Sequence, residues 1–125
     1  MLYALLAYHV EDVITALSEE EDAALMAELH RVHDRLAEAG RLGPAARLGP
    51  TADARTLRRE RRPPVLDGPF AETKEQLLGF YVVDCPDMEA ALQVAQDLGK
   101  ANPSAVYEVR PISLFLPGTL AAPTA

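Results

Sequence analysis

The order of strand-like and helical segments is the feature that most constrains this chain of 125 residues. Residues 2–9 are apolar at nearly every position, which is typical of a central strand that is covered on both faces. Residues 77–83 and 106–116 are two further apolar segments with strand character. Two segments with the apolar spacing of helices lie between them. The first covers about 19–39; the second follows Asp87, its expected cap, and is expected to end at Gly99. The length fits a single domain, because domains usually comprise ~100–150 residues.

The first helical segment has a defined start and a defined end in the sequence. Ser18 followed by Glu21 is a capping box, in which each side chain accepts a hydrogen bond from the backbone N–H of the other residue. Acidic residues at 19–22 stabilise the positive end of the helix dipole. One apolar stripe follows, and Gly40 provides the C-terminal stop. The stripe consists of Leu25, Leu29, Val32 and Leu36.

Residues 41–66 predict a short hairpin. Its two strands are expected at 56–57 and 65–66, on either side of the arginine-rich run 58–62. The prolines at 63–64 cannot sit in a central strand, so the hairpin is placed at a sheet edge. We expect the arginine-rich run to be a solvated edge that prevents aggregation, with binding of an acidic partner or a phosphate as the alternative.

The whole order predicts an α+β fold with a ferredoxin-like antiparallel sheet and two main helices on one face. Two helices can cover only one face of such a sheet, yet the strands carry apolar residues on both faces. We assign Leu5, Tyr81 and Tyr107 to the uncovered face. A second copy of the chain would hide this face, so we expect a homodimer that packs sheet to sheet.

The composition excludes several classes of protein. Hydrophobic residues make up 49% and charged residues 25%, which is typical of a globular domain rather than a disordered or membrane-embedded chain. The net charge of −7 argues against direct binding of nucleic acid. No apolar run approaches the ~20 residues of a membrane helix, and the single cysteine excludes an intrachain disulfide. We therefore expect a cytoplasmic protein without a membrane partner.

The segment DGPFAETKEQL at residues 67–77 is the most distinctive motif of the chain. Together with Phe80 and Tyr81 it closely resembles the signature of the DGPF branch of the YCII-related family. Supporting segments lie in the same order along residues 1–112. The resemblance implies a single YCII-related domain over residues 1–116. The C-terminal tail at 117–125 consists of small residues and prolines, so we expect it to be mobile. It also implies a ferredoxin-like fold that dimerises as an α/β barrel, with a pocket between the two sheets.

The resemblance is less specific about function. Relatives of the fold include isomerases of small aromatic compounds and cofactor-free monooxygenases, and some family members carry a His–Asp pair in the pocket. Many DGPF proteins are encoded beside, or fused to, extracytoplasmic-function sigma factors. This chain has Leu77-Leu78-Gly79 where members usually have Leu-Gly-Gly, which predicts less room in the pocket.

Asp67 and His30 are the candidate catalytic residues. Asp67 could act as a general base if it is buried at the mouth of its turn, or it could simply cap that turn. His30 is the candidate for the family's pocket histidine, although a position on the flank of the helix stripe is the plainer interpretation. His30 and His33 lie one turn apart, but two ligands make a poor zinc site, so no metal is predicted.

Tyr8, Tyr81, Tyr107 and Arg110 are the candidate substrate-binding residues. The tyrosines lie on strands expected to line the dimer pocket, where a phenol offers an apolar wall and one hydrogen bond. Packing within the sheet is the alternative. Arg110 could orient an anionic substrate, or form an ordinary cross-strand ion pair with Glu108.

Two functions follow from these observations. The first is a small enzyme that does acid/base chemistry on a small polar or aromatic molecule. No cofactor is expected, because the chain has no phosphate-binding glycine loop, no serine elbow and no cysteine pair. The alternative is a non-catalytic dimeric module, ligand-binding or regulatory, that is associated with an extracytoplasmic-function sigma factor.

Overall fold

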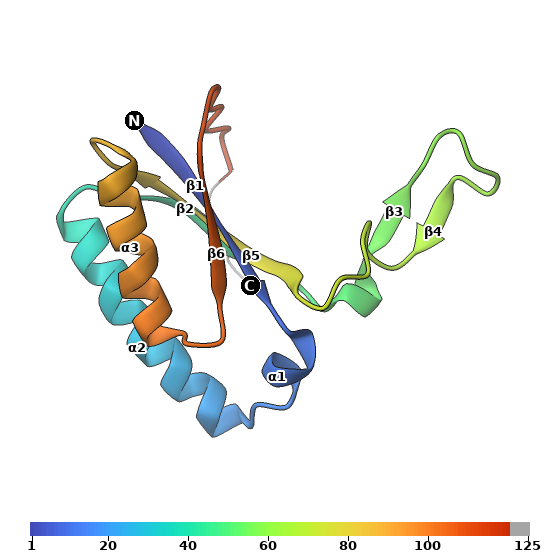
Figure 1. Ribbon diagram of the computed structural model, residues 1–125, viewed down its shortest axis with the longest axis horizontal. Helices are drawn as coiled ribbons and strands as arrows, with labels where there is room; N and C mark the ends of the chain where they lie inside the picture. Colours follow the sequence, from blue (N-terminus) through green and yellow to red (C-terminus); the bar gives the residue numbers. More distant parts are fainter. Residues whose placement is uncertain (121–125) are drawn as a thin grey trace.

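A computed structural model describes residues 1–120 and shows a four-stranded antiparallel sheet (Figure 1). The strand order is β2 (Leu42–Arg47), β5 (Gln76–Asp84), β1 (Leu2–His9) and β6 (Val106–Pro111). The central strand β1 pairs antiparallel with both β5 and β6. The sequence therefore predicted the central position of the first strand correctly.

Two long helices, α2 (Glu19–Glu38) and α3 (Met88–Ala101), lie together on one face of this sheet (Figure 1). The expected capping box starts α2: Ser18 Oγ accepts from the Glu21 N–H at 3.0 Å, and Glu21 Oε1 accepts from the Ser18 N–H at 2.9 Å. The predicted α+β class is confirmed, and the strand order is consistent with a ferredoxin-like arrangement.

The alternation of β1 divides its side chains between the two faces of the sheet. Tyr3 and Leu5 are buried under the helices in the hydrophobic core, whereas Leu6 points to the uncovered face and is half-buried. Tyr81 is opposite Leu5 and packs against the same core, as Tyr107 does. The assignment of Leu5, Tyr81 and Tyr107 to the uncovered face was therefore wrong. The helices cover the face of the sheet on which these three side chains lie.

The predicted hairpin exists, but it does not join the main sheet. Strands β3 (Arg55–Leu57) and β4 (Val65–Asp67) form a separate two-stranded sheet. This ribbon, which we call the arm (residues 54–68), projects from the body of the molecule, away from α2 and α3 (Figure 1). The prediction that the hairpin forms the edge of the main sheet was wrong; β2 takes that edge instead.

Several boundaries differ from the predicted ones. Helix α3 continues through Gly99 to Ala101, and β6 ends at Pro111, opposite Tyr3 of β1. Sequence analysis missed the short helices α1 (Glu11–Thr15) and η1 (Thr51–Asp53). Residues 121–125 of the expected tail lie outside the described residues.

Candidate active site

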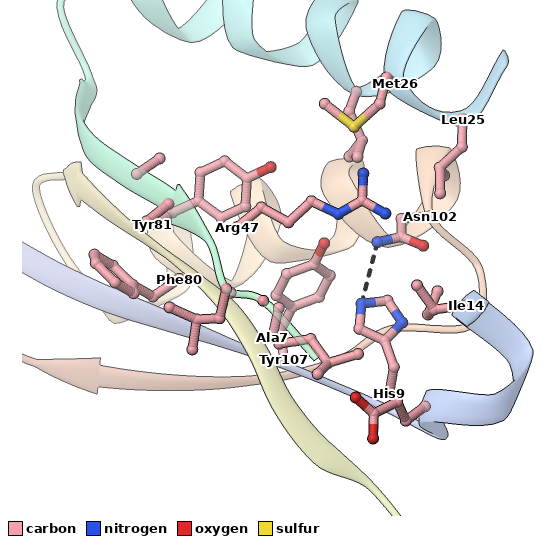
Figure 2. A pocket seen from close by; sticks show the side chains of 18 of the residues that line it. Ala7, His9, Ile14, Leu25, Met26, Arg47, Phe80, Tyr81, Asn102 and Tyr107 are labelled. Carbon is pink, nitrogen blue, oxygen red and sulfur yellow. Dashed lines mark hydrogen bonds between the residues drawn. The ribbon is translucent and has the colours of Figure 1, made fainter. Parts of the chain in front are cut away.

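A pocket of about 460 Å³ lies between α2 and the helix-covered face of the sheet (Figure 2). Apolar side chains form most of its wall, and β1, β2, β5 and β6 contribute its floor. A volume of this size and an apolar lining with few polar groups are typical of small-molecule sites. The main polar side chains in the wall are His9, His33, Arg47, Tyr81, Asn102 and Tyr107.

His9 is the best-placed acid/base group in this pocket. It is the last residue of β1, and only 5% of it is exposed. Its Nε2 lies 3.4 Å from Asn102 Nδ2 (Figure 2). Its Nδ1 lies 3.1 Å from Ser104 Oγ. An amide nitrogen only donates, so a neutral His9 accepts at Nε2 and donates from Nδ1 to the serine oxygen.

Burial keeps His9 neutral. Loss of solvent lowers the pKa of His9 below its ordinary value of 6.5, and the positive charge of Arg47 lowers it further. A neutral imidazole whose acceptor nitrogen is held only by a long hydrogen bond can take a proton from a bound molecule. Ser104 is exposed, so the far side of the ring has a hydrogen-bonded route to solvent.

Asn102 leaves one polar atom in the pocket wall unsatisfied. It follows the last turn of α3, where its backbone N–H donates to Leu98 O at 2.9 Å, and it is 7% exposed. Its Nδ2 faces His9, but its Oδ1 has no hydrogen-bond partner. Buried polar atoms without a partner are rare because leaving them unpaired costs free energy. Turning the amide toward the pocket would bring this unpaired acceptor within reach of a bound molecule.

Arg47 brings a positive charge to the same side of the pocket. It is the last residue of β2, and its guanidinium lies on the side of His9 and Asn102 in Figure 2. Two of its nitrogens contact the carboxylate of Asp22 on α2, at 3.0 and 3.3 Å. Half of the arginine side chain is exposed, so this pair lies at the rim rather than in the core.

A second pair of polar groups lies further along the pocket. His33 Nε2 is 2.7 Å from the hydroxyl of Tyr81. Burial lowers the pKa of His33, and it raises the pKa of Tyr81 to about 12. Burial also raises the pKa of Tyr107, against a smaller opposite effect of the Asn102 amide. Both phenols therefore remain protonated hydrogen-bonding groups near neutral pH.

Gly79 allows β2 and β5 to approach closely beneath the pocket. A Cβ at this position would lie 2.9 Å from the backbone oxygen of Ala46 on the neighbouring strand. Any side chain here would push these strands apart and reshape the floor. The neighbouring Leu78 also lines the pocket.

Asp67 lies outside this pocket. It ends β4 on the arm, its side chain is 92% exposed, and its Oδ1 is 3.1 Å from Nε of Arg55. The burial on which its predicted role as a base depended is absent. Its catalytic role stays a prediction without support from the geometry.

The other predicted site residues are divided between three places. Tyr81 and Tyr107 line the pocket, although from the opposite face to the one expected. His30 is exposed and touches the pocket only through the ring of His33, with 5.4 Å between the ring centroids.

Tyr8 and Arg110 lie on the uncovered face of the sheet, where both contact Glu108. The predicted ion pair of Arg110 and Glu108 is confirmed, but it runs along β6 rather than across strands.

Sequence analysis missed His9, Arg47 and Asn102 as functional residues. The signal for His9 was present, because a histidine that ends an apolar strand on the parity of Leu5 must be buried with it. The other two residues come from a strand end and a helix end that are distant in sequence. Only the folded chain brings them together.

The described part of the chain has neither a metal-binding cluster nor a membrane-spanning helix. Within residues 1–120, no three His, Cys, Asp or Glu side chains are grouped so that they could hold a metal ion. In the same part of the chain, every helix is too short or too polar to cross a membrane.

Comparison with known proteins gives a family but no established activity. The model of the YCII-related domain matches residues 1–116. An uncharacterised protein of Rhizobium meliloti (strain 1021) is 55% identical over 122 residues, which cover 96% of this chain and 98% of that relative.

Proposed function

The chain belongs to the YCII-related family, and we propose that it is a small cofactor-free enzyme that does acid/base chemistry in the pocket beneath α2. One observation carries this proposal: His9 is buried and neutral, with Nε2 in the pocket and Nδ1 bonded to the exposed Ser104. The proposed base is thus His9, in place of the Asp67 and His30 expected from the sequence.

The chemistry supported best is proton abstraction from a bound molecule. His9 Nε2 accepts the proton as the ligand takes the place of the long contact from Asn102. The electron pair left on the ligand delocalises onto an oxygen, which the amide of Asn102 and the guanidinium of Arg47 stabilise. The Nδ1–H keeps its hydrogen bond to Ser104, and the proton on Nε2 exchanges with solvent in the pocket. Its return to the ligand carbon re-forms the neutral ligand and the imidazole that accepts at Nε2.

Deuterium exchange tests this proposal without knowledge of the natural substrate. The probes are phenylpyruvate and phenylacetone, which combine a ring with an acidic C–H group next to a carbonyl. In D₂O, NMR should show wild-type protein replacing that hydrogen faster than buffer does. His9→Gln should lower the protein-dependent rate by about 10²- to 10⁴-fold, the usual contribution of a general base. Gln retains hydrogen-bonding capacity at this position but cannot accept the proton.

The same assay separates His9 from the alternative base. A loss of exchange in Asp67→Asn with full exchange in His9→Gln would move the catalytic group to the arm and contradict the proposal. A probe that binds the protein without any exchange above the buffer rate would contradict catalysis. Circular dichroism of each variant verifies that it has folded.

We also propose the finer assignments that accompany this family. The motif at residues 67–77 supports membership of the DGPF branch. The uncovered face of the sheet, with Leu6 and Phe80 paired on it, supports a sheet-to-sheet homodimer in the form of an α/β barrel. The single cysteine, Cys85, is buried and free, which supports a location in the reducing cytoplasm.

A second candidate function is a non-catalytic module that works with a protein partner such as a sigma factor. The arm favours it, because five arginines and one glutamate at residues 55–62 form a basic ribbon on an otherwise acidic chain. Replacing Arg58, Arg59 and Arg61 by Ser should abolish co-purification of that partner and leave deuterium exchange intact. If the variant retains its partner, the arm is not the binding surface.

A further inference from the structure

The charges around the pocket indicate what kind of molecule it binds. Arg47 is the only lysine or arginine among the described residues that line it, and Glu11 is the only acidic one. The carboxylate of Glu11 is already engaged by Thr51, whose backbone N–H donates at 2.8 Å and whose hydroxyl also donates. Glu11 keeps its negative charge but is held by Thr51, and the carboxylate paired with Arg47 is that of Asp22.

The present partner of Arg47 is weakly held. Asp22 contacts the guanidinium from the rim, and the side chains of Arg47 and Asp22 are 52% and 36% exposed. Ion pairs this exposed contribute little to stability because water screens them. A ligand carboxylate that arrives inside the pocket can take the same two nitrogens and release Asp22 to solvent.

Asn102 supplies the second requirement. Its Oδ1 has no hydrogen-bond partner and almost no exposed surface, so the amide must turn before this oxygen can accept an O–H or N–H from a ligand in the pocket. The third requirement comes from the apolar wall, in which Leu25, Met26 and Leu29 of α2 face the sheet. This wall favours a ring or a short hydrocarbon body.

We infer that the pocket binds a small organic acid: an apolar or aromatic body, a carboxylate that pairs with Arg47, and an adjacent hydroxyl or amine that donates to Asn102. Hydroxy acids and the enol forms of keto acids have this combination of groups. This inference deepens the proposed function, because it names the class of molecule on which His9 would act.

Asp22 then acts as an internal competitor of the ligand. In the free protein its carboxylate occupies the nitrogens that the ligand needs. Removing its charge should strengthen binding of acids and leave neutral molecules unaffected. Removing the positive charge of Arg47 should weaken binding of acids, whereas removing the negative charge of Asp22 should strengthen it. A general loss of folding would weaken binding in both variants.

Calorimetric titration of three matched compounds tests the inference. Hydrocinnamate carries the ring and the carboxylate, hydrocinnamamide replaces the carboxylate by a neutral amide, and phenyllactate adds a hydroxyl beside the carboxylate. We expect phenyllactate to bind best and hydrocinnamamide worst. Arg47→Gln should weaken both acids by about 10- to 100-fold, the usual effect of losing a charge-assisted pair. Asp22→Asn should strengthen them several-fold.

The control variant is Arg31→Gln, which removes an arginine on the exposed side of α2 that pairs with Glu28 and does not line the pocket. It should bind every compound as the wild type does. Equal binding of the acid and the amide, or unchanged binding in Arg47→Gln, would overturn the substrate class and leave the pocket as a site for neutral ligands. Tight binding of acids without deuterium exchange would instead support this inference and contradict the catalytic proposal.

Discussion

At the scale of single residues, the proposed chemistry depends on His9, which β1 places in the interior. His9 shares the parity of the core residues Tyr3 and Leu5, and so it lies under the helices. Its two ring nitrogens have different surroundings, with Asn102 and the pocket at one and the exposed Ser104 at the other. This asymmetry suits a group that exchanges protons between a ligand and solvent.

The buried histidines predict how stability depends on pH. Burial lowers the pKa values of His9 and His33 below the ordinary 6.5. Below about pH 6.5 the unfolded chain therefore takes up protons that the folded chain does not, and the free energy of unfolding falls as the solution is acidified. Urea denaturation between pH 7.5 and about pH 5 should show this loss, above the range in which carboxylates titrate.

His9→Gln provides the comparison for the pH experiment. The variant should lose part of the slope below about pH 6.5, because one of the two buried histidines no longer contributes. An identical slope in both proteins would mean that His9 is accessible to protons in the folded state. It would then not be the neutral base that the proposal needs.

Single residues were the hardest level to predict from the sequence. The DGPF motif favoured Asp67 as the catalytic base, but Asp67 lies exposed on the arm. His30 was the predicted pocket histidine of this helix, whereas His33, one turn further on, contacts Tyr81. Local spacing places residues on faces, but the choice between adjacent histidines depends on how the helix is rotated on the sheet.

At the scale of elements, the ends of the long helices show which sequence signals were sufficient. The N-terminal caps of α2 and α3 were both predicted. Ser18 and Glu21 form the capping box of α2, and Asp87 caps α3, with its Oδ1 accepting from the Ala90 N–H at 2.8 Å. Gly40 has a φ of +69° and follows α2 as expected. Gly99 was expected to end α3 in the same way, but it lies inside the helix. Glycine permits a helix end without requiring one.

This difference between the two glycines gives a prediction. Gly99→Ala should stabilise the protein by about 0.5–1 kcal/mol, because alanine favours helix interiors and nothing lies within 4 Å of the new Cβ. Gly40→Ala should destabilise it by about 1–2 kcal/mol, because its positive φ is unfavourable for any side chain. Nothing lies near that Cβ either, so the pair compares backbone conformation alone.

Thermal denaturation of the two variants measures this pair. A stabilised Gly40→Ala, or a destabilised Gly99→Ala, would mean that the helix ends differ from the ones described.

Other elements were set by pairing between distant segments. The arm separates from the main sheet, and β2 pairs with β5 in its place. Both segments are short and rich in glycine, proline or arginine. Their local patterns could not decide which of them joins the sheet.

At the scale of the whole molecule, the unpaired face of the sheet predicts assembly. Leu6 and Phe80 face each other across β1 and β5 on the side away from the helices. A second copy placed on this face would cover them. Native mass spectrometry should therefore find a dimer in the wild type and a monomer in Leu6→Glu, because a buried unpaired carboxylate opposes the interface.

A control for this prediction is Glu89→Gln, a change on the exposed side of α3, which should leave the dimer intact. A wild-type monomer at micromolar concentration would contradict the assembly. It would leave the pocket unaffected, since the described chain of one molecule provides all of its lining.

The α+β class could be read from the sequence because it follows from element order. The position of the pocket could not, because it depends on which face the helices cover.

The most direct test of the central claim is an NMR titration of ¹⁵N-labelled protein with phenyllactate. We predict that the signals of four pocket residues shift together during the titration. They are the side-chain amide of Asn102 and the backbone amides of Ala7, Arg47 and Gly79. Signals of Gly68 and Phe70 should stay in place. Shifts confined to those two residues, or to the uncovered face around Leu6, would contradict a site beneath α2.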